Sequence, residues 1–243
     1  MSEGGALIGV GVGPGDPELL TLKAIRVLKE VEVIAHFAKA GNASNARATI
    51  VGHIRPDVTE LTFRYPVTTE IPRNTRDYCD RMRTFYDDSA ATVAAHLDAG
   101  HRVAVICEGD PLFYGSYMHL HVRLAARYPT EVVAGVTGMS GCWSAVATPI
   151  AQGNDVFTVL PGTLSENELE RRLEDANCAV IMKLGRNLPK VRRALRRAGR
   201  LDRAIYVERG TTANAASMRL TAKLDDEAPY LSMVLVPGWE EPV

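Results

Sequence analysis

The chain has 243 residues, a length that suits one large domain or two domains of about 100–130 residues each. Its 46% hydrophobic residues indicate a globular protein, and a formal net charge of −1 argues against general attraction to nucleic acid or anionic membranes. Four scattered cysteines without a C-x-x-C pair argue against zinc or a disulfide framework and favour a reducing compartment. With neither a signal-peptide pattern nor an apolar run long enough to cross a membrane, the sequence predicts a cytoplasmic protein. No metal site is predicted.

The first half of the chain alternates between apolar runs typical of buried strands and segments with helical periodicity. Thr21 is placed to cap the first helix. The apolar face predicted for that helix consists of Leu22, Ile25, Val27 and Leu28. Predicted strands cover 6–12, 31–35, 58–63, 102–107 and 131–133. Further helices are predicted over 74–99, in one or two pieces, and over 114–127.

Small residues and glycines at 135–141 mark a junction, after which the pattern restarts. Predicted strands follow at 155–160, 178–183 and 203–208, with helices at 166–176 and 188–198. The last two predicted strands, 217–223 and 230–236, are expected to pair with each other. The sequence therefore predicts an α/β fold in two domains, 1–134 and 135–243, with a cleft between them.

Two glycine-rich turns, 9–16 (GVGVGPGD) and 108–115 (EGDPLFYG), each follow an apolar strand. Because the carboxyl ends of parallel strands meet at one edge of a sheet, both turns are expected at the edge where open α/β sheets bind ligands. The first turn departs from the dinucleotide pattern G-x-G-x-x-G, whose last glycine is replaced by Pro14 or Asp16, depending on the starting glycine. Pro14 has no N–H for a phosphate and Asp16 would repel one, so we expect a ligand other than a phosphate.

Three segments together are similar to the tetrapyrrole methylase family: VGVGPGDPELLTLKA at 10–24, Gly109-Asp110-Pro111, and GVTG at 135–138. The resemblance covers nearly the whole chain. It implies the tetrapyrrole methylase fold, with two α/β domains and a cofactor cleft between them. It also implies S-adenosylmethionine as the cofactor and a homodimer as the usual assembly. Trp143 and Phe157, expected to be exposed apolar side chains in need of a partner, are consistent with a dimer.

Within the family, the segments 109–124, 65–68 and 181–186 resemble a branch of cobalamin biosynthesis. Glu108, where a sibling branch has glycine, and the long stretch before the second turn favour the same branch. The resemblance implies methyl transfer to carbon 20 of the tetrapyrrole precorrin-2, giving precorrin-3A. Alternatives are the same step on cobalt-factor II, another tetrapyrrole methylase, or an RNA methyltransferase. The nearly neutral charge counts against the RNA substrate.

The resemblance also implies a set of cofactor-binding residues. Asp110 would receive the methionine ammonium or face the sulfonium, and the alternative role is a turn residue that caps the next helix. The second domain would contact the adenine, in a register uncertain by one residue. The full set is Pro14, Gly109, Asp110, Phe113, Thr137, Gly138, Met182, Lys183, Leu184 and Gly210.

No general base is identified by the motifs. Glu108, Tyr114 and Tyr117 are candidates by proximity in the sequence alone, and packing or structural hydrogen bonding is an equal alternative for each. A loop predicted at 64–73 supplies guanidinium and hydroxyl groups suited to the carboxylate arms of a tetrapyrrole, unless it is an ordinary connection. Its candidate substrate-binding residues are Arg64, Tyr65, Thr68 and Arg73. The basic run 186–203 has helical spacing and is interpreted as a solvated face, with attraction of a polycarboxylate as the alternative.

Overall fold

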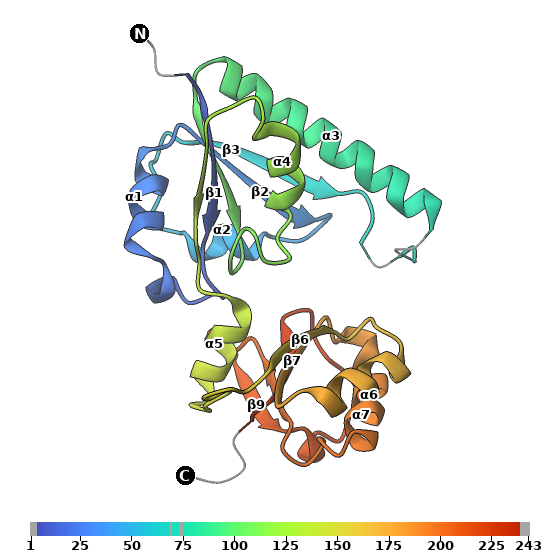
Figure 1. The fold of residues 1–243 in the computed structure, drawn as a ribbon. Coiled ribbons are helices and arrows are strands. Elements are labelled where there is room, and N and C mark those ends of the chain that lie inside the picture. Colours follow the sequence, from blue (N-terminus) through green and yellow to red (C-terminus); the bar gives the residue numbers. More distant parts are fainter. Residues whose placement is uncertain (1–3, 69, 73–74, 239–243) are drawn as a thin grey trace. The chain divides into compact units, whose positions relative to one another are not determined.

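A computed structural model of the chain describes residues 4–68, 70–72 and 75–238. They fold into two compact α/β units, Met1–Thr137 and Gly138–Val243, drawn in Figure 1. The division falls inside the glycine-rich segment 135–141 that the sequence marks as a junction. Each unit has a sheet and a core of its own. In the described part of the chain, no helix is both long and apolar enough to span a membrane.

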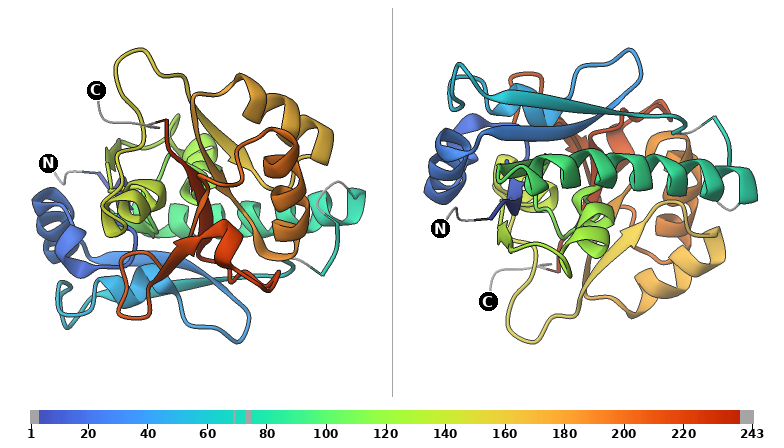
Figure 2. Two further views of the ribbon diagram at one scale, coloured as in Figure 1. Left: turned by 90° about the horizontal axis from the view of Figure 1, so that it is seen from below. Right: turned by 90° about the horizontal axis from the view of Figure 1, so that it is seen from above.

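The N-terminal unit is built on a parallel sheet with the strand order β3-β2-β4-β1-β5. The strands are β1 (Ala6–Gly11), β2 (Val33–Lys39), β3 (Thr59–Tyr65), β4 (Arg102–Cys107) and β5 (Thr130–Val133). The helices are α1 (Leu22–Glu30), α2 (Asn45–Thr49), α3 (Arg76–Asp98) and α4 (Tyr117–Leu124), with a short 3₁₀ turn at Pro17–Leu19. Helices α1 and α2 cover one face of the sheet, and α3 and α4 cover the other (Figures 1 and 2).

The inner strands β1 and β4 are covered on both faces of the sheet, which explains their unbroken apolar sequences. Alternate residues of β1 point to opposite sides, so Ile8 packs on the α1 side and Leu7 on the α3 side. The Thr21 hydroxyl accepts a hydrogen bond from the Ala24 N–H at 3.1 Å and confirms the predicted cap of α1. Leu22 is 87% exposed, so its predicted place on the apolar face is wrong. Leu22 lies two residues before the buried Ala24, and this spacing is more than half a helical turn. The two side chains therefore lie on opposite sides of α1.

Most element boundaries in the N-terminal unit differ from the predicted ones by a few residues. Helix α3 is one continuous helix. Strand β3 extends to Tyr65, so Arg64 and Tyr65 belong to a strand and not to the predicted loop. Helix α4 begins only at Tyr117, because Tyr114 has a φ of +56° and belongs to the preceding turn. Helix α2, a five-residue helix capped by the Ser44 hydroxyl, was not predicted.

The C-terminal unit has a mixed sheet with the strand order β6-β7-β10-β8-β9. Its strands are β6 (Phe157–Pro161), β7 (Cys178–Met182), β8 (Ile205–Glu208), β9 (Ala216–Arg219) and β10 (Ser232–Val236). Its helices are α5 (Gly138–Ala145), α6 (Glu166–Asp175) and α7 (Leu188–Arg197), with 3₁₀ turns at Gly185–Asn187 and Leu220–Ala222. The predicted pairing of the last two strands is wrong, because β9 and β10 pair with opposite sides of β8.

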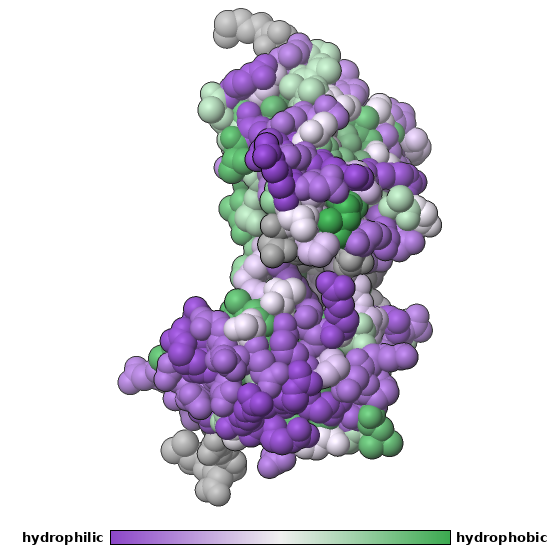
Figure 3. All heavy atoms as spheres, turned by 90° about the vertical axis from the view of Figure 1, so that its right-hand side faces the viewer, coloured by the Kyte–Doolittle hydropathy of each residue, from purple (hydrophilic) through white to green (hydrophobic). Residues whose placement is uncertain are grey.

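Two surfaces of the C-terminal unit bear on the sequence predictions. The predicted exposure of Trp143 and Phe157 is wrong: both are half-buried, and their rings contact each other edge to face at 6.0 Å between centroids. Trp143 lies on α5, and both side chains pack on the core cluster that includes Cys142 and Leu235. The basic run of α7 forms ion pairs with α6, such as Arg193 with Glu166 at 2.8 Å. Figure 3 shows that this α6–α7 face is mainly hydrophilic. The interpretation of the run as a solvated face is therefore supported.

Candidate functional site: the paired glycine turns

The two glycine-rich turns meet at the carboxyl edge of the N-terminal sheet, as the sequence predicts. Strands β1 and β4 are adjacent and parallel, with Gly11 opposite Cys107. Beyond their ends, the Gly109 N–H donates to the Gly13 carbonyl at 2.8 Å, and the Gly13 N–H donates to the Gly109 carbonyl at 3.4 Å. The turns therefore form one backbone platform, although a hundred residues separate them in the sequence.

Three glycines from three strand ends pack backbone to backbone in this platform. A Cβ on Gly11 would lie 2.6 Å from the carbonyl oxygen of Gly109 and 2.6 Å from the Cα of Gly135. A Cβ on Gly135 would lie even closer to the same carbonyl oxygen. Gly109 itself has a φ of +65°, a conformation that favours glycine. The glycines are therefore required by the close approach of β1, β4 and β5, a reason that the sequence pattern alone did not reveal.

Asp110 connects two segments of the platform through both carboxylate oxygens. Its Oδ1 accepts a hydrogen bond from the Leu112 N–H at 2.9 Å, and its Oδ2 accepts one from the Gly135 N–H at 3.1 Å. The first bond shapes the turn, and the second ties the segment after β5 to the segment after β4. The side chain is half-buried. Asp110 therefore has a definite structural role, and its predicted contact with the ammonium stays a prediction.

The three candidate bases lie in different environments. Glu108 is an exposed residue, but the protein atoms around its carboxyl group raise the pKa of Glu108 through desolvation. A hydrogen bond with Asn45 acts on this pKa in the opposite direction. Tyr117 is fully buried under Gly9 and its hydroxyl lies 3.1 Å from Nδ1 of His121. Burial raises the pKa of Tyr117 to about 12, which favours the packing alternative over a role as base.

Tyr114 and Phe113 lie in the second turn, next to Asp110. Their rings contact each other edge to face with centroids 4.9 Å apart. Tyr114 is 48% exposed, whereas Phe113 is half-buried. Across the platform, Pro14 is half-buried after Gly13, whose φ is +76°. These side chains border the platform.

The remaining cofactor candidates lie at or after the junction. Thr137 ends the N-terminal unit and Gly138 begins α5. In the C-terminal unit, Met182 ends β7 and Lys183 follows with a φ of +59°. The Leu184 side chain is wholly buried in the core, which leaves only its backbone to contact a ligand. Gly210 packs closely on α5, since a Cβ there would lie 2.7 Å from the Cys142 sulfur.

The candidate substrate residues are separated by the fold. As neighbours on β3, Arg64 and Tyr65 point to opposite faces of the sheet. The Tyr65 hydroxyl lies 2.5 Å from that of Ser116, and its ring stacks on Phe37. Thr68 hydrogen-bonds Glu70 through its N–H and its hydroxyl. Arg73 lies outside the described residues.

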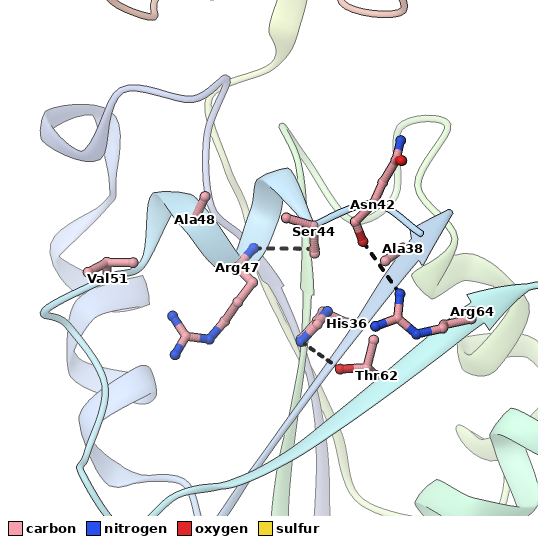
Figure 4. Close-up of a pocket in the computed structure, with 10 residues that line it drawn as sticks. His36, Ala38, Asn42, Ser44, Arg47, Ala48, Val51, Thr62 and Arg64 are labelled. Atoms are coloured by element: carbon pink, nitrogen blue, oxygen red, sulfur yellow. Dashed lines mark hydrogen bonds between the residues drawn. The ribbon is translucent and has the colours of Figure 1, made fainter. Parts of the chain in front are cut away.

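Arg64 lines an open pocket of about 290 Å³ between α2 and the neighbouring strands β2 and β3 (Figure 4). Figure 4 shows its guanidinium directed at the Asn42 carbonyl, 3.4 Å away. Below it, His36 is 5% exposed; its Nε2 lies 3.2 Å from the Thr62 hydroxyl, and its Nδ1 has no hydrogen-bond partner within the described residues. The Arg47 guanidinium is paired with Glu60 through bonds of 2.6 and 2.9 Å.

His36 is expected to make stability depend on pH below neutrality. Burial lowers its pKa from the ordinary value of 6.5, and Arg47 and Arg64 act in the same direction, whereas Glu60 opposes them. Below pH 6.5 His36 therefore binds a proton in the unfolded chain but not yet in the folded chain. The free energy of unfolding should fall with decreasing pH, by at most about 1.4 kcal/mol per unit, until the folded pKa is reached. In urea titrations between pH 7.5 and 5, His36→Gln should reduce this slope without abolishing it, because burial also lowers the pKa of His119. An unchanged slope would contradict the assignment.

Comparisons with known proteins agree with this architecture. The family model of the tetrapyrrole (corrin/porphyrin) methylases matches residues 6–225. A precorrin-2 C(20)-methyltransferase from Sinorhizobium sp is 62% identical over 98% of this chain and 97% of its own length. A cobalt-precorrin-2 C(20)-methyltransferase from Salmonella typhimurium is 24% identical over 97% of this chain and 98% of its own.

Among solved structures, the uroporphyrin-III C-methyltransferase from Thermus thermophilus complexed with S-adenyl homocysteine has the same fold. It superposes with a TM-score of 0.64 at 23% identity, over 95% of this chain and 96% of that one. The predicted two-domain α/β fold is thereby confirmed. Since the family model spans nearly the whole sequence and the relative from Sinorhizobium is matched over almost its full length, this chain belongs to the tetrapyrrole methylase family.

Proposed function

We propose that this chain transfers the methyl group of S-adenosylmethionine to carbon 20 of precorrin-2, giving precorrin-3A in cobalamin biosynthesis. The observation that carries the proposal is the 62% identity, over nearly the full length of both chains, with a precorrin-2 C(20)-methyltransferase. The relative named for the cobalt-containing substrate is only 24% identical. This difference favours metal-free precorrin-2 over its cobalt complex.

The platform has a composition suited to S-adenosylmethionine. The ligand carries a sulfonium, an ammonium, a carboxylate and an adenine, and the platform offers backbone groups, one or two carboxylates and aromatic side chains. We propose that the residues at the turns and the junction bind it together with positions of the C-terminal unit. These are Pro14, Gly109, Asp110, Phe113, Thr137, Gly138, Met182, Lys183, Gly210 and the backbone of Leu184.

Methyl transfer requires the protein mainly to align the two reactants. Bound S-adenosylmethionine supplies a methyl group on a positively charged sulfur, and carbon 20 of the reduced tetrapyrrole is already electron-rich. Holding the two reactants in line and excluding water can provide much of the rate enhancement. A rigid backbone platform that contains three closely packed glycines is well suited to hold one reactant in a fixed position.

Incubation with S-adenosylmethionine and each candidate substrate tests the proposal. We expect precorrin-2 to gain the mass of one methyl group at carbon 20, as read by mass spectrometry and NMR of the product. Turnover of the cobalt complex in place of precorrin-2 would move the assignment to the cobalt-dependent step. Methylation of neither substrate would refute the proposal.

Substrate carboxylates offer a second test, at Arg64. We propose that this exposed guanidinium binds a carboxylate arm of the tetrapyrrole, since within the described residues its hydrogen bond is a long one, 3.4 Å to the Asn42 carbonyl. Arg64→Gln should raise KM for precorrin-2 about tenfold, the scale of one charged hydrogen bond, and leave the Kd of S-adenosylmethionine unchanged. Arg81→Gln, on α3 and paired with Asp77, is the matched control. An unchanged KM would remove Arg64 from substrate recognition.

The assembly and location are part of the proposal as well. We propose a homodimer, on the basis of the family resemblance, in the cytoplasm. Trp143 and Phe157 no longer support the dimer, because they pack on their own unit. Sedimentation velocity at micromolar concentration should give the mass of two chains, and a single-chain mass would refute the dimer.

A further inference from the structure

The hydroxyl of Ser116 joins three elements of the N-terminal unit. It lies 2.5 Å from the Tyr65 hydroxyl, at the end of β3, and 3.2 Å from the Tyr86 hydroxyl, on α3. Ser116 itself directly precedes α4, which begins at Tyr117. The two tyrosines are 51 and 30 positions away from Ser116 in the sequence, so the contacts depend on the tertiary structure.

The hydroxyl of Ser116 does not serve the helix that follows it. A serine before a helix commonly accepts a hydrogen bond from a backbone N–H of the first turn, as Thr21 and Ser44 do for α1 and α2. Ser116 makes no such bond. Its φ of −69° and ψ of −19° are helical, whereas a capping residue has an extended backbone. The hydroxyl is therefore directed to the two tyrosines instead of its own helix.

Aromatic packing holds both tyrosine hydroxyls in place. The Tyr65 ring stacks on Phe37 with centroids 5.7 Å apart. The Tyr86 ring is buried and stacks on His119, a residue of α4, with centroids 3.9 Å apart. Because close packing restricts both rings, their hydroxyls define the position of Ser116 relative to β3 and α3.

The turn that ends at Ser116 carries residues proposed above to bind the cofactor. Its start is fixed to the platform by the backbone of Gly109 and the carboxylate of Asp110. The turn folds closely on itself, since a Cβ on Gly115 would lie 2.8 Å from the carbonyl oxygen of Pro111. It is therefore held at both ends, by the platform at its start and by Ser116 at its end.

The other end of this connection lies beside the residue proposed to bind the substrate. Tyr65 follows Arg64 on β3, so the contact with Ser116 fixes the end of the strand that carries Arg64. Methyl transfer requires the sulfur, the methyl carbon and carbon 20 in line, and a misplacement of about 1 Å can lower the rate about 10²-fold. Alignment of the two reactants thus depends on how the turn and the strand end are held relative to each other.

We propose that Ser116 is a positioning residue, whose hydroxyl holds the cofactor turn and the end of β3 in the relative position that methyl transfer requires. Ser116 acts through Tyr65 and the turn, and contacts neither reactant in this role. The inference rests on the proposed function and adds to it a residue for which the motifs assign no role.

Ser116→Ala is the principal test, since it removes the hydroxyl and leaves both tyrosines unchanged. With precorrin-2 as substrate, kcat should fall by about tenfold or more, because the reactants are less well aligned. The KM for precorrin-2 and the Kd of S-adenosylmethionine, measured by calorimetry, should stay near the parental values, because each segment still binds its own ligand.

Ser89→Ala is the matched control. Ser89 is a buried serine on α3, and its hydroxyl donates a hydrogen bond to the Phe85 carbonyl at 2.7 Å within the same helix. If Ser116 were merely structural, both variants would have a lower thermal midpoint and the parental kcat. In the positioning role, Ser116→Ala lowers kcat and Ser89→Ala does not.

A double-mutant cycle tests whether Ser116 acts through Tyr65. Tyr65→Phe alone should lower kcat, and adding it to Ser116→Ala should change kcat little further, because the contact is already lost. Fully independent losses in the double variant would overturn the inference.

Two other results would also overturn it. One is a Ser116→Ala protein with the parental kcat. The other is a rise in KM or Kd with kcat unchanged, which would make Ser116 a binding residue. A parent protein that does not methylate precorrin-2 at all would refute the proposed function, and the inference with it, before any variant is compared.

Discussion

Gly135→Ala is expected to disrupt the carboxyl edge of the N-terminal sheet and to abolish binding of S-adenosylmethionine. The added Cβ would lie 2.8 Å from the Cα of Gly11 and still closer to the carbonyl oxygen of Gly109. Those neighbours are backbone atoms of two paired turns, so they cannot rotate away as a side chain would. Urea titration should show a loss of about 3 kcal/mol in the free energy of unfolding, the upper end for overpacking. Calorimetry should detect no cofactor binding.

Gly4→Ala is the control for this prediction. A Cβ at Gly4 has no heavy atom within 4 Å, so the change should alter stability by less than about 0.5 kcal/mol. The residue precedes β1 and takes no part in the platform. If Gly135→Ala folded with parental stability and bound the cofactor normally, the close packing of the three strand ends would not be needed for the site.

Asp110→Ala is expected to weaken S-adenosylmethionine binding by more than about tenfold and to lower stability as well. It removes the acceptor for the Leu112 and Gly135 N–H groups, each bond to a carboxylate being worth roughly 1.5–3 kcal/mol. The segments after β4 and β5 would lose the tie between them. Calorimetry measures the affinity, and urea titration of the same protein measures the stability.

Asp110→Asn separates the two roles of this carboxylate. Asparagine keeps one oxygen acceptor and the size of the side chain but has no charge. If Asp110 also binds the ammonium, affinity should fall at least tenfold while stability falls less than in Asp110→Ala. If it acts only as a tie between loops, affinity and stability should fall in proportion across both variants. Parental affinity in Asp110→Ala would refute the binding role, and parental stability would refute the role as a tie between the loops.

Local sequence signals predicted the parts of this fold that depend on nearby residues. Strand β4 has the predicted limits, because its apolar run ends at a glycine turn. Thr21 caps α1 as predicted, since an N-cap bond reaches only three residues along the chain. The glycine turns were expected at one sheet edge, and strand pairing confirms it. Helix α2 was missed because five residues give no readable periodicity.

By itself the sequence determined the α/β class, the order of most elements, the paired turns and the family resemblance, because each is written in contiguous residues. Only the tertiary structure decided which partner each polar or small residue has. It showed that Gly11, Gly109 and Gly135 pack together, that Asp110 holds the Gly135 N–H, and that Tyr117 is buried. These relations join residues far apart in the chain, so they depend on strand order and register, which no local pattern records.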